Sequence, residues 1–248
     1  MRLFLLLEFP ECALGVLHIV QGELAHPNEM RDDGLRAVPD PGPLMLGDRM
    51  AGVPGSAVVP VLQGRRPLVV EVQALVGPGT AGGASRPHTL GLDAARANLL
   101  VAVLACRTAV AVPAGAEFFV AAVGGISVTE PAADLAVALA LASVLTERAL
   151  PPDLVAFGEL GLAGEVRQVP GAERRLAEAY RAGFTRALVP ASTLTVGDGG
   201  TAALPAGLVV HGVRTLAEAL AVAGSEVGAE AGPGTMPGWP TVPAAASL

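Results

Sequence analysis

The segment from Pro131 to Thr146 is apolar on nearly every side of a helix, and it constrains the fold more than any other part of the sequence. Its only charged residue is Asp134, near its start. Pro131 stands in the first turn, where helices favour proline, so we expect a helix from Ala132 to about Thr146. A helix without a polar face is buried on all sides. The rest of the chain therefore has to build layers around it.

The flanking segments alternate between strand-like and helix-like patterns. Two β-branched runs at 56–62 and 67–76, separated by Gln63-Gly64-Arg65-Arg66, predict a hairpin. Further strands are predicted at 117–123, 154–159, around 166, at 187–189 and at 207–211, and helices at 93–110, 172–182 and 215–222. Residues 77–90 are mainly Gly, Ser, Thr and Pro, which predicts a loop. This alternation predicts an α/β fold, of the two-layer α+β sandwich type.

Composition divides the chain into three parts. Prolines interrupt every hydrophobic run in residues 1–45, which we expect to be an irregular leader. The leucine-rich start resembles a signal peptide, but Glu8 and Pro10 break it, so we do not expect export. Residues 46–223 should form the folded domain. Residues 224–248 are dominated by Gly, Pro, Ala and Ser and should be disordered.

Bulk composition limits the classes of function. The chain has 248 residues, 52% of them hydrophobic and only 3% aromatic, so its core should consist of small side chains. A formal charge of −7 argues against autonomous DNA binding. Cys12 and Cys106 lack C-x-x-C spacing, which fits a reducing, cytoplasmic protein without a disulfide framework. No run of about 18 apolar residues is free of Gly, Pro and charge, so we expect no membrane partner.

Three stretches carry a family resemblance. They are Gly52–Ala57 followed by Arg66–Val76, then Gly124-Gly125 with Thr129–Ala140, and finally Phe157–Arg167. In this order and spacing they resemble the C-terminal, Lon-protease-like domain of the bacterial RadA (Sms) DNA repair proteins. The resemblance covers roughly residues 29–222.

The resemblance implies a ribosomal-protein-type Lon-like domain, with a mixed sheet and helices on one face. In the family this domain follows a RecA-like motor that drives branch migration, and the implied partners are further copies in a hexameric ring and branched or duplex DNA. The family's four-cysteine zinc finger, Walker A loop and Lys-Asn-Arg-Phe-Gly motif are not found in this sequence. Gly77–Gly83 is glycine-rich but lacks the Gly-Lys-Ser/Thr ending of a phosphate loop. We therefore expect ATP, magnesium and zinc only in the family's N-terminal domains, and this chain could be a truncated or split reading frame.

The catalytic dyad of a Lon peptidase is a serine activated by a lysine. By the resemblance, the serine position falls on Ala132 and the lysine position on Arg175. A methyl group cannot attack a peptide, and a guanidinium stays protonated and cannot act as a base. We expect that this chain is not an enzyme. A peptidase with displaced residues, using Ser127 or Ser143, is the alternative.

Arginines suggest a DNA contact. Arg174, Arg175, Arg181 and Arg186 give residues 171–190 a net positive charge in an acidic chain, and Arg65 and Arg66 lie at the predicted hairpin tip. Repeated around a ring, such cations could add up to a phosphate-binding surface. The alternative is a solvated helix face with intrahelical ion pairs.

No metal or cofactor site is expected in this chain. Glu130 and Asp134 lie four residues apart at a helix start, where a metal or the helix dipole could use them, and we favour the dipole. The histidines have no metal-binding spacing. The sequence is thus interpreted as a proteolytically inactive Lon-like scaffold of a RadA-type repair protein, contributing subunit assembly and DNA contact. The other alternative is a remnant or interaction module without a DNA role.

Overall fold

The computed structural model describes residues 19–20, 23–24, 28–31, 34–37, 46–64, 66–77, 86–194 and 205–230. The chain divides into two compact units, residues 1–41 and 42–248. In the first unit, which we expected to be irregular, the structure describes two short antiparallel pairs: β1 (Ile19–Val20) with β2 (Glu23–Leu24), and β3 (Asn28–Arg31) with β4 (Gly34–Ala37). Most of the leader, residues 78–85 and 195–204, and the tail beyond Glu230 lie outside the described residues.

The second unit contains a mixed four-stranded sheet in the order β5-β6-β8-β7. Its strands are β5 (Ser56–Gln63), β6 (Arg66–Gly77), β7 (Arg86–Leu90) and β8 (Glu117–Ala122). The predicted hairpin is confirmed, with Ser56 opposite Gln73 and Gln63 opposite Arg66. Strand β7, which runs parallel to β8, corrects the prediction of a loop over residues 77–90.

A second sheet is entirely parallel and has the order β13-β12-β9. It consists of β9 (Leu154–Ala156), β12 (Arg186–Pro190) and β13 (Val209–Val213), and the 3-10 turn η2 (Ala191–Thr193) follows β12. A small antiparallel pair, β10 (Glu159–Leu160) with β11 (Val166–Arg167), lies between β9 and β12 in the sequence. These elements place the Gly158–Gly164 region beside the start of the central helix, since the Leu135 amide donates to the Gly158 carbonyl.

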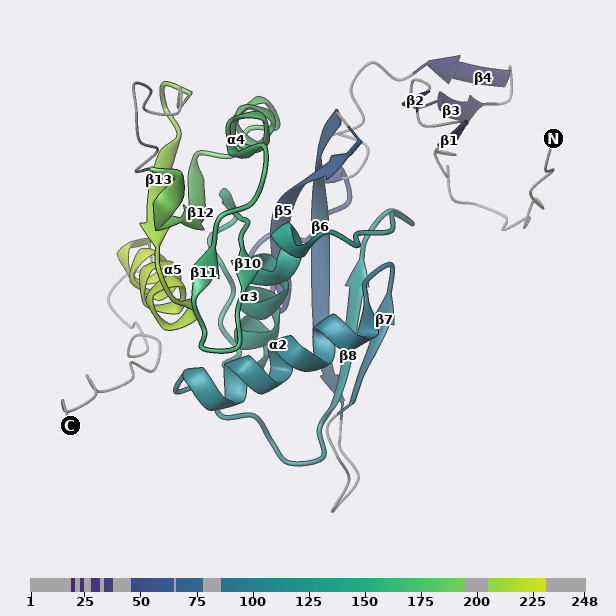
Figure 1. Ribbon diagram of the computed structural model, residues 1–248. Coiled ribbons are helices and arrows are strands. Elements are labelled where there is room, and N and C mark those ends of the chain that lie inside the picture. The colour runs from purple at the N-terminus through teal and green to yellow at the C-terminus, as the bar shows by residue number, and fades with distance from the viewer. Residues whose placement is uncertain are drawn as a thin grey trace. The chain divides into compact units, whose positions relative to one another are not determined.

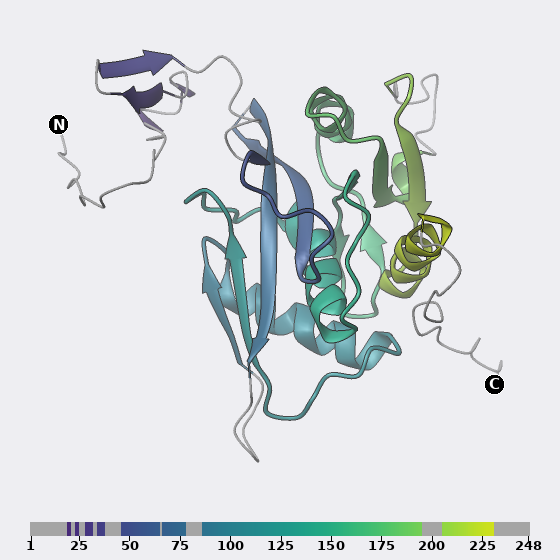
Figure 2. The same cartoon turned by 180° about the vertical axis from the view of Figure 1, so that it is seen from behind.

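Four helices lie in the described part of this unit. They are α2 (Ala94–Arg107), α3 (Asp134–Leu145) preceded by the 3-10 turn η1 (Pro131–Ala133), α4 (Ala172–Arg181) and α5 (Leu216–Glu230). Asp93 caps α2 by accepting from the Arg96 amide. Helices α2 and α3 lie against the same face of the four-stranded sheet (Figures 1 and 2). Helix α5 continues six residues past Gly224, where we had placed the start of the tail.

Helix α3 lies at the centre of the core, as its apolar sequence predicts. Its first ten residues are all buried, and it packs against β5, β6, α2 and α5. Alanine at every second or third position lets these neighbours approach the helix closely. The α/β fold is therefore confirmed. None of the helices in the described part of the chain has the length and apolarity of a membrane span.

Candidate functional site

Ala132 lies in η1, immediately before the central helix, and is 2% exposed. Its carbonyl accepts a hydrogen bond from the Gly158 amide at 2.9 Å, so its backbone is tied to the turn that follows β9. The side chain at this position is a methyl group. The residue at the predicted serine position therefore contributes packing.

Arg175 comes from the first half of α4 and is 1% exposed. Its guanidinium donates to both carboxylate oxygens of Glu130, at 2.7 Å each. Nη1 also donates to the Pro60 carbonyl at 2.7 Å, and Nε donates to the Pro170 carbonyl at 3.0 Å. Four hydrogen bonds thus hold a buried cation whose charge a carboxylate neutralises.

Glu130 extends this arrangement into the sheet. Its Oε1 accepts the Leu62 amide at 2.8 Å, and the Arg175 guanidinium lies 5.9 Å from the centre of the Phe157 ring. The pair therefore connects α4, the end of β5 and the entry to η1. A guanidinium held in this way keeps its proton and cannot activate a nucleophile.

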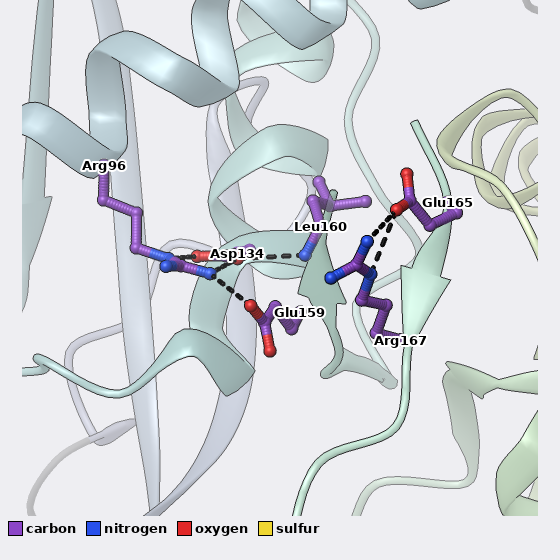
Figure 3. Close-up of polar contacts among 6 residues, drawn as sticks. All are labelled: Arg96, Asp134, Glu159, Leu160, Glu165 and Arg167. Atoms are coloured by element: carbon purple, nitrogen blue, oxygen red, sulfur yellow. Dashed lines mark hydrogen bonds and ion pairs between the residues drawn. The ribbon is translucent and has the colours of Figure 1, made fainter. Parts of the chain in front are cut away.

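A second ion-pair cluster lies at the start of α3. Asp134 accepts from Arg96 of α2 through two hydrogen bonds and from the Leu160 amide of β10 at 2.9 Å. Arg96 also approaches Glu159 at 3.4 Å (Figure 3). Burial raises the pKa of Asp134, although Arg96 and the Leu160 amide oppose that rise. The hydrogen bond with Asp134 raises the pKa of Arg96.

Glu130 and Asp134 make contacts that the sequence did not predict, although Asp134 lies in the first turn of α3, where the dipole interpretation places it. Neither makes a side-chain capping bond to its helix, because each carboxylate is committed to an arginine from another element. The described residues contain no group of three His, Cys, Asp or Glu side chains that could hold a metal ion. These two carboxylates are tertiary contacts between layers.

The serines of the alternative peptidase are placed differently. Ser143 is fully buried in α3, where its hydroxyl accepts the Gly55 amide at 2.9 Å and donates to the Arg148 carbonyl at 2.5 Å. Ser127 is exposed. All 16 basic residues of the sequence are arginines, so no lysine is present to serve as a base.

The arginines predicted to contact DNA differ in burial and in their partners. Arg175 is interior and cannot reach a phosphate, so we remove it from that set. Arg181 pairs with Glu178 at 2.5 Å, an intrahelical pair of the kind the alternative predicts. Arg186 pairs with Asp153 at 2.5 Å, which is a contact between β12 and the residue before β9. Arg174 is exposed on α4 and Arg66 is half-buried on β6, while Arg65 lies outside the described residues.

Sequence reasoning missed the carboxylates that pair with Arg175 and Arg96. The Arg175–Glu130 pair spans 45 residues and the Arg96–Asp134 pair spans 38. The only available signal was the carboxylates themselves, which lie beside an otherwise apolar helix.

Residues 124–193 match the family model of subunit ChlI of Mg-chelatase. The matches with individual relatives cover more of the chain. RadA of Mycolicibacterium smegmatis is 42% identical over 198 residues, which make up 80% of this chain. The chain is homologous to part of the DNA repair protein RadA. RadA of Escherichia coli is 43% identical over 78% of the chain, and RadA of Streptococcus pneumoniae is 41% identical over 77%.

The chain spans only part of these RadA relatives, 40% to 44% of their lengths.

The comparisons contradict the prediction that the chain is not an enzyme. The matching family is by its description a subunit of an enzyme, Mg-chelatase, and the match includes both Ala132 and Arg175. RadA homology extends over most of the chain, which spans less than half of those proteins. Our prediction rested on missing motifs, and motifs missing from one aligned region do not define the activity of proteins of which that region is less than half.

Proposed function

We propose that the chain is a Lon-like domain of a RadA-type DNA repair protein. At the lysine position of the peptidase dyad it holds Arg175, which forms a structural ion pair with Glu130. The observation that carries this proposal is Arg175, buried at the lysine position and bonded to both oxygens of Glu130. Ala132 stands at the serine position. At the lysine position, Arg175 joins α4 to the start of η1 and to β5 instead of serving peptide cleavage. Their contribution is therefore to the rigidity of the domain.

We also propose that the domain assembles with further copies of itself, as the RadA resemblance implies. Support comes from the face of the four-stranded sheet opposite α2 and α3. Leu75, Phe119 and Leu90 are 61%, 42% and 72% exposed there, and His88 stacks on Phe119 with ring centres 5.0 Å apart. Leu75, Phe119 and His88 lie opposite one another across β6, β8 and β7. Apolar side chains gathered on one sheet face are typical of subunit contacts.

DNA contact is proposed for the exposed face of α4, with Arg174 and Arg181 as the phosphate-binding side chains. Two such contacts per subunit are weak in an acidic chain, so their effect depends on repetition in an assembly. We further propose a cytoplasmic location. For the ATP, magnesium and zinc of the family we propose binding sites in the family's N-terminal domains, because this sequence has no lysine for a phosphate loop.

Fluorescence anisotropy with labelled four-way DNA tests this role. We expect affinity that falls as salt rises, with a log–log slope near −2 for about two phosphate contacts per subunit. Arg174→Gln combined with Arg181→Gln should weaken binding and flatten that slope. Arg107→Gln, on the C-terminal turn of α2, is the matched control and should bind like the parent chain. Equal binding by the double variant would refute the DNA contact.

A further inference from the structure

Tyr180 is the single tyrosine of the sequence, and it lies in the second half of α4. The helix buries Leu176 and Ala179, which are both 0% exposed, whereas Tyr180 is 45% exposed. A tyrosine combines a large apolar ring with one polar atom, and such rings are enriched at interfaces. The ring of Tyr180 is therefore a candidate contact surface on the outer side of α4.

The chain beside Tyr180 contacts the ring without covering it. A Cβ placed on Gly207 would lie 3.4 Å from Tyr180 Oη and 3.5 Å from Cε2, so the backbone that leads into β13 passes close to the ring. Because residue 207 carries no side chain, the ring is contacted at its hydroxyl-bearing edge and stays accessible elsewhere. A ring held in this way loses little conformational entropy when it makes a further contact.

Two arginines share the outer side of α4 with this ring. Arg174 and Arg181 are seven residues apart, which places them about 20° apart around a helix and about 10 Å apart along it. Ala177 is exposed between them, and Tyr180 lies one turn after Ala177 and directly before Arg181. The Arg181 side chain is 48% exposed even though it pairs with Glu178. An aromatic ring thus flanks a pair of cations on one helix surface.

Charge gives this surface only a weak attraction for nucleic acid. Glu173 is exposed seven residues before Tyr180 and so on the same side of the helix, Glu178 carries a second carboxylate, and the whole chain has a formal charge of −7. Two arginines beside two carboxylates leave no local excess of positive charge, so phosphate contacts alone would hold any strand loosely. A contact that does not depend on net charge has to supply the rest of the affinity.

Base stacking is such a contact. One nucleobase stacked on an aromatic side chain raises affinity about five- to 150-fold, and every base has a face that can stack. In a duplex the bases stack on one another, so their faces are not available to a side chain on a protein surface. In an unpaired strand the bases can turn outward, while the phosphates next to them remain accessible to arginines. The ring therefore distinguishes an unpaired strand from a duplex, which arginines alone do not.

We propose that the outer side of α4 binds single-stranded DNA in preference to duplex DNA, with one base stacked on Tyr180 and phosphates bound by Arg174 and Arg181. This preference rests on the DNA contact proposed above, because it names the kind of strand that the contact takes. Tyr180 is the residue that distinguishes unpaired from paired DNA. A contact with another copy of the chain through the ring is the rival, and it predicts a change in assembly state instead of a change in DNA affinity.

Fluorine NMR tests the stacking directly, because the chain has only one tyrosine. Incorporation of fluorotyrosine gives the full chain a single resonance, at Tyr180. We expect oligothymidine, which forms no base pairs with itself, to shift this resonance saturably, while a duplex of equal length produces little shift. Fluorescence anisotropy with the same DNAs, labelled, should give an affinity at least about fivefold higher for the single strand.

Matched substitutions at residue 180 separate the ring from its bulk. Tyr180→Leu keeps an apolar side chain but removes the ring, so it should weaken single-strand binding about fivefold or more and leave duplex binding unchanged. Tyr180→Phe keeps the ring and should bind like the parent chain. Because the side chain is half-exposed, neither variant disturbs the core.

An unchanged fluorine resonance, or equal single-strand binding by the parent and Tyr180→Leu, would overturn the stacking contact. If Arg174→Gln with Arg181→Gln still weakens binding in that case, the DNA contact proposed above survives. The opposite result, in which only Tyr180→Leu weakens binding, keeps the stacking and removes the two arginines from the site. A Tyr180→Leu variant that sediments differently from the parent but binds DNA equally assigns the ring to a contact between copies and also overturns the proposal.

Discussion

A single side chain, Arg175, carries the proposal that a catalytic position has become a structural one. A lysine at this place would have to lose its proton to act as a base, and burial favours that loss. An arginine keeps its charge and needs a counterion, which Glu130 provides through two parallel hydrogen bonds. The planar guanidinium also reaches two carbonyls that one ammonium could not bond in the same geometry.

Removing this cation should destabilise the domain strongly. We expect Arg175→Met to lower the free energy of unfolding by about 3 kcal/mol, because Glu130 and two carbonyls lose their partner. Urea unfolding followed by circular dichroism measures the loss. The neighbouring exposed change Arg174→Met is the control and should stay within about 0.5 kcal/mol of the parent. A comparable loss in the two variants would contradict the structural role of Arg175.

Restoring the serine alone should not restore peptidase chemistry. Ala132→Ser places a hydroxyl at the Lon position, but the chain has no lysine and Arg175 is bound to Glu130. We expect no cleavage of fluorescent casein by the parent chain or by this variant, and no labelling by serine-reactive probes. Cleavage that depends on residue 132 would show that another group acts as the base.

At the scale of elements, local sequence patterns predicted most of the helices and strands. The hairpin β5–β6 follows from two β-branched runs around a turn, and the buried helix α3 follows from a long apolar run that begins at a proline. Strand β7 was missed because Pro87 and the preceding glycine-rich stretch are typical of a loop. Its position at the sheet edge explains why a proline is tolerated there, and its parallel pairing with β8 depends on a contact formed across α2.

The candidate site was predictable only in part. The family resemblance pointed to Ala132 and Arg175, and the structure buries both, but Glu130 was interpreted as a partner of the helix dipole. Which carboxylate meets which arginine depends on how α2, α3 and α4 pack, and a single sequence does not contain that geometry.

The parallel sheet has an ion pair whose strength should depend on pH. Asp153, just before β9, accepts three hydrogen bonds from Arg186, the first residue of β12. It accepts another from the hydroxyl of Thr185, which precedes that strand. Burial alone would raise the pKa of Asp153, but these hydrogen bonds outweigh it and the pKa is lowered. The stabilisation is therefore complete above the unfolded pKa of about 3.9 and is lost as pH falls through the lower folded value.

Asp153→Asn tests this pH dependence. At neutral pH we expect it to lower the free energy of unfolding by up to about 1 kcal/mol, since the pair is partly exposed. The difference from the parent should shrink as pH falls below about 4, when the parent's own carboxylate becomes protonated. Unfolding midpoints measured from pH 7 to acid follow the change. A difference that is constant over this range would exclude the ion pair as its cause.

For the second unit as a whole, the two faces of the four-stranded sheet differ. One face is covered by α2 and α3, and its side chains join the core. Leu75, Phe119 and Leu90 lie outside that core on β6, β8 and β7. A strongly negative chain gains no association from charge, so apolar contact is the physical means by which copies of this domain could associate.

Self-association should therefore respond to changes on this face. We expect Leu75→Glu and Phe119→Glu each to raise the dissociation constant of any assembly about tenfold or more, because burying one such side chain contributes about 1.5–3 kcal/mol and a buried carboxylate opposes contact. Leu162→Glu is the matched control, since Leu162 is 68% exposed in the β10–β11 turn. Sedimentation velocity over a range of concentrations gives the assembly size. If the sheet variants sediment like the parent and the control, the contact must use another surface, because a carboxylate cannot be accommodated in an apolar interface without weakening it.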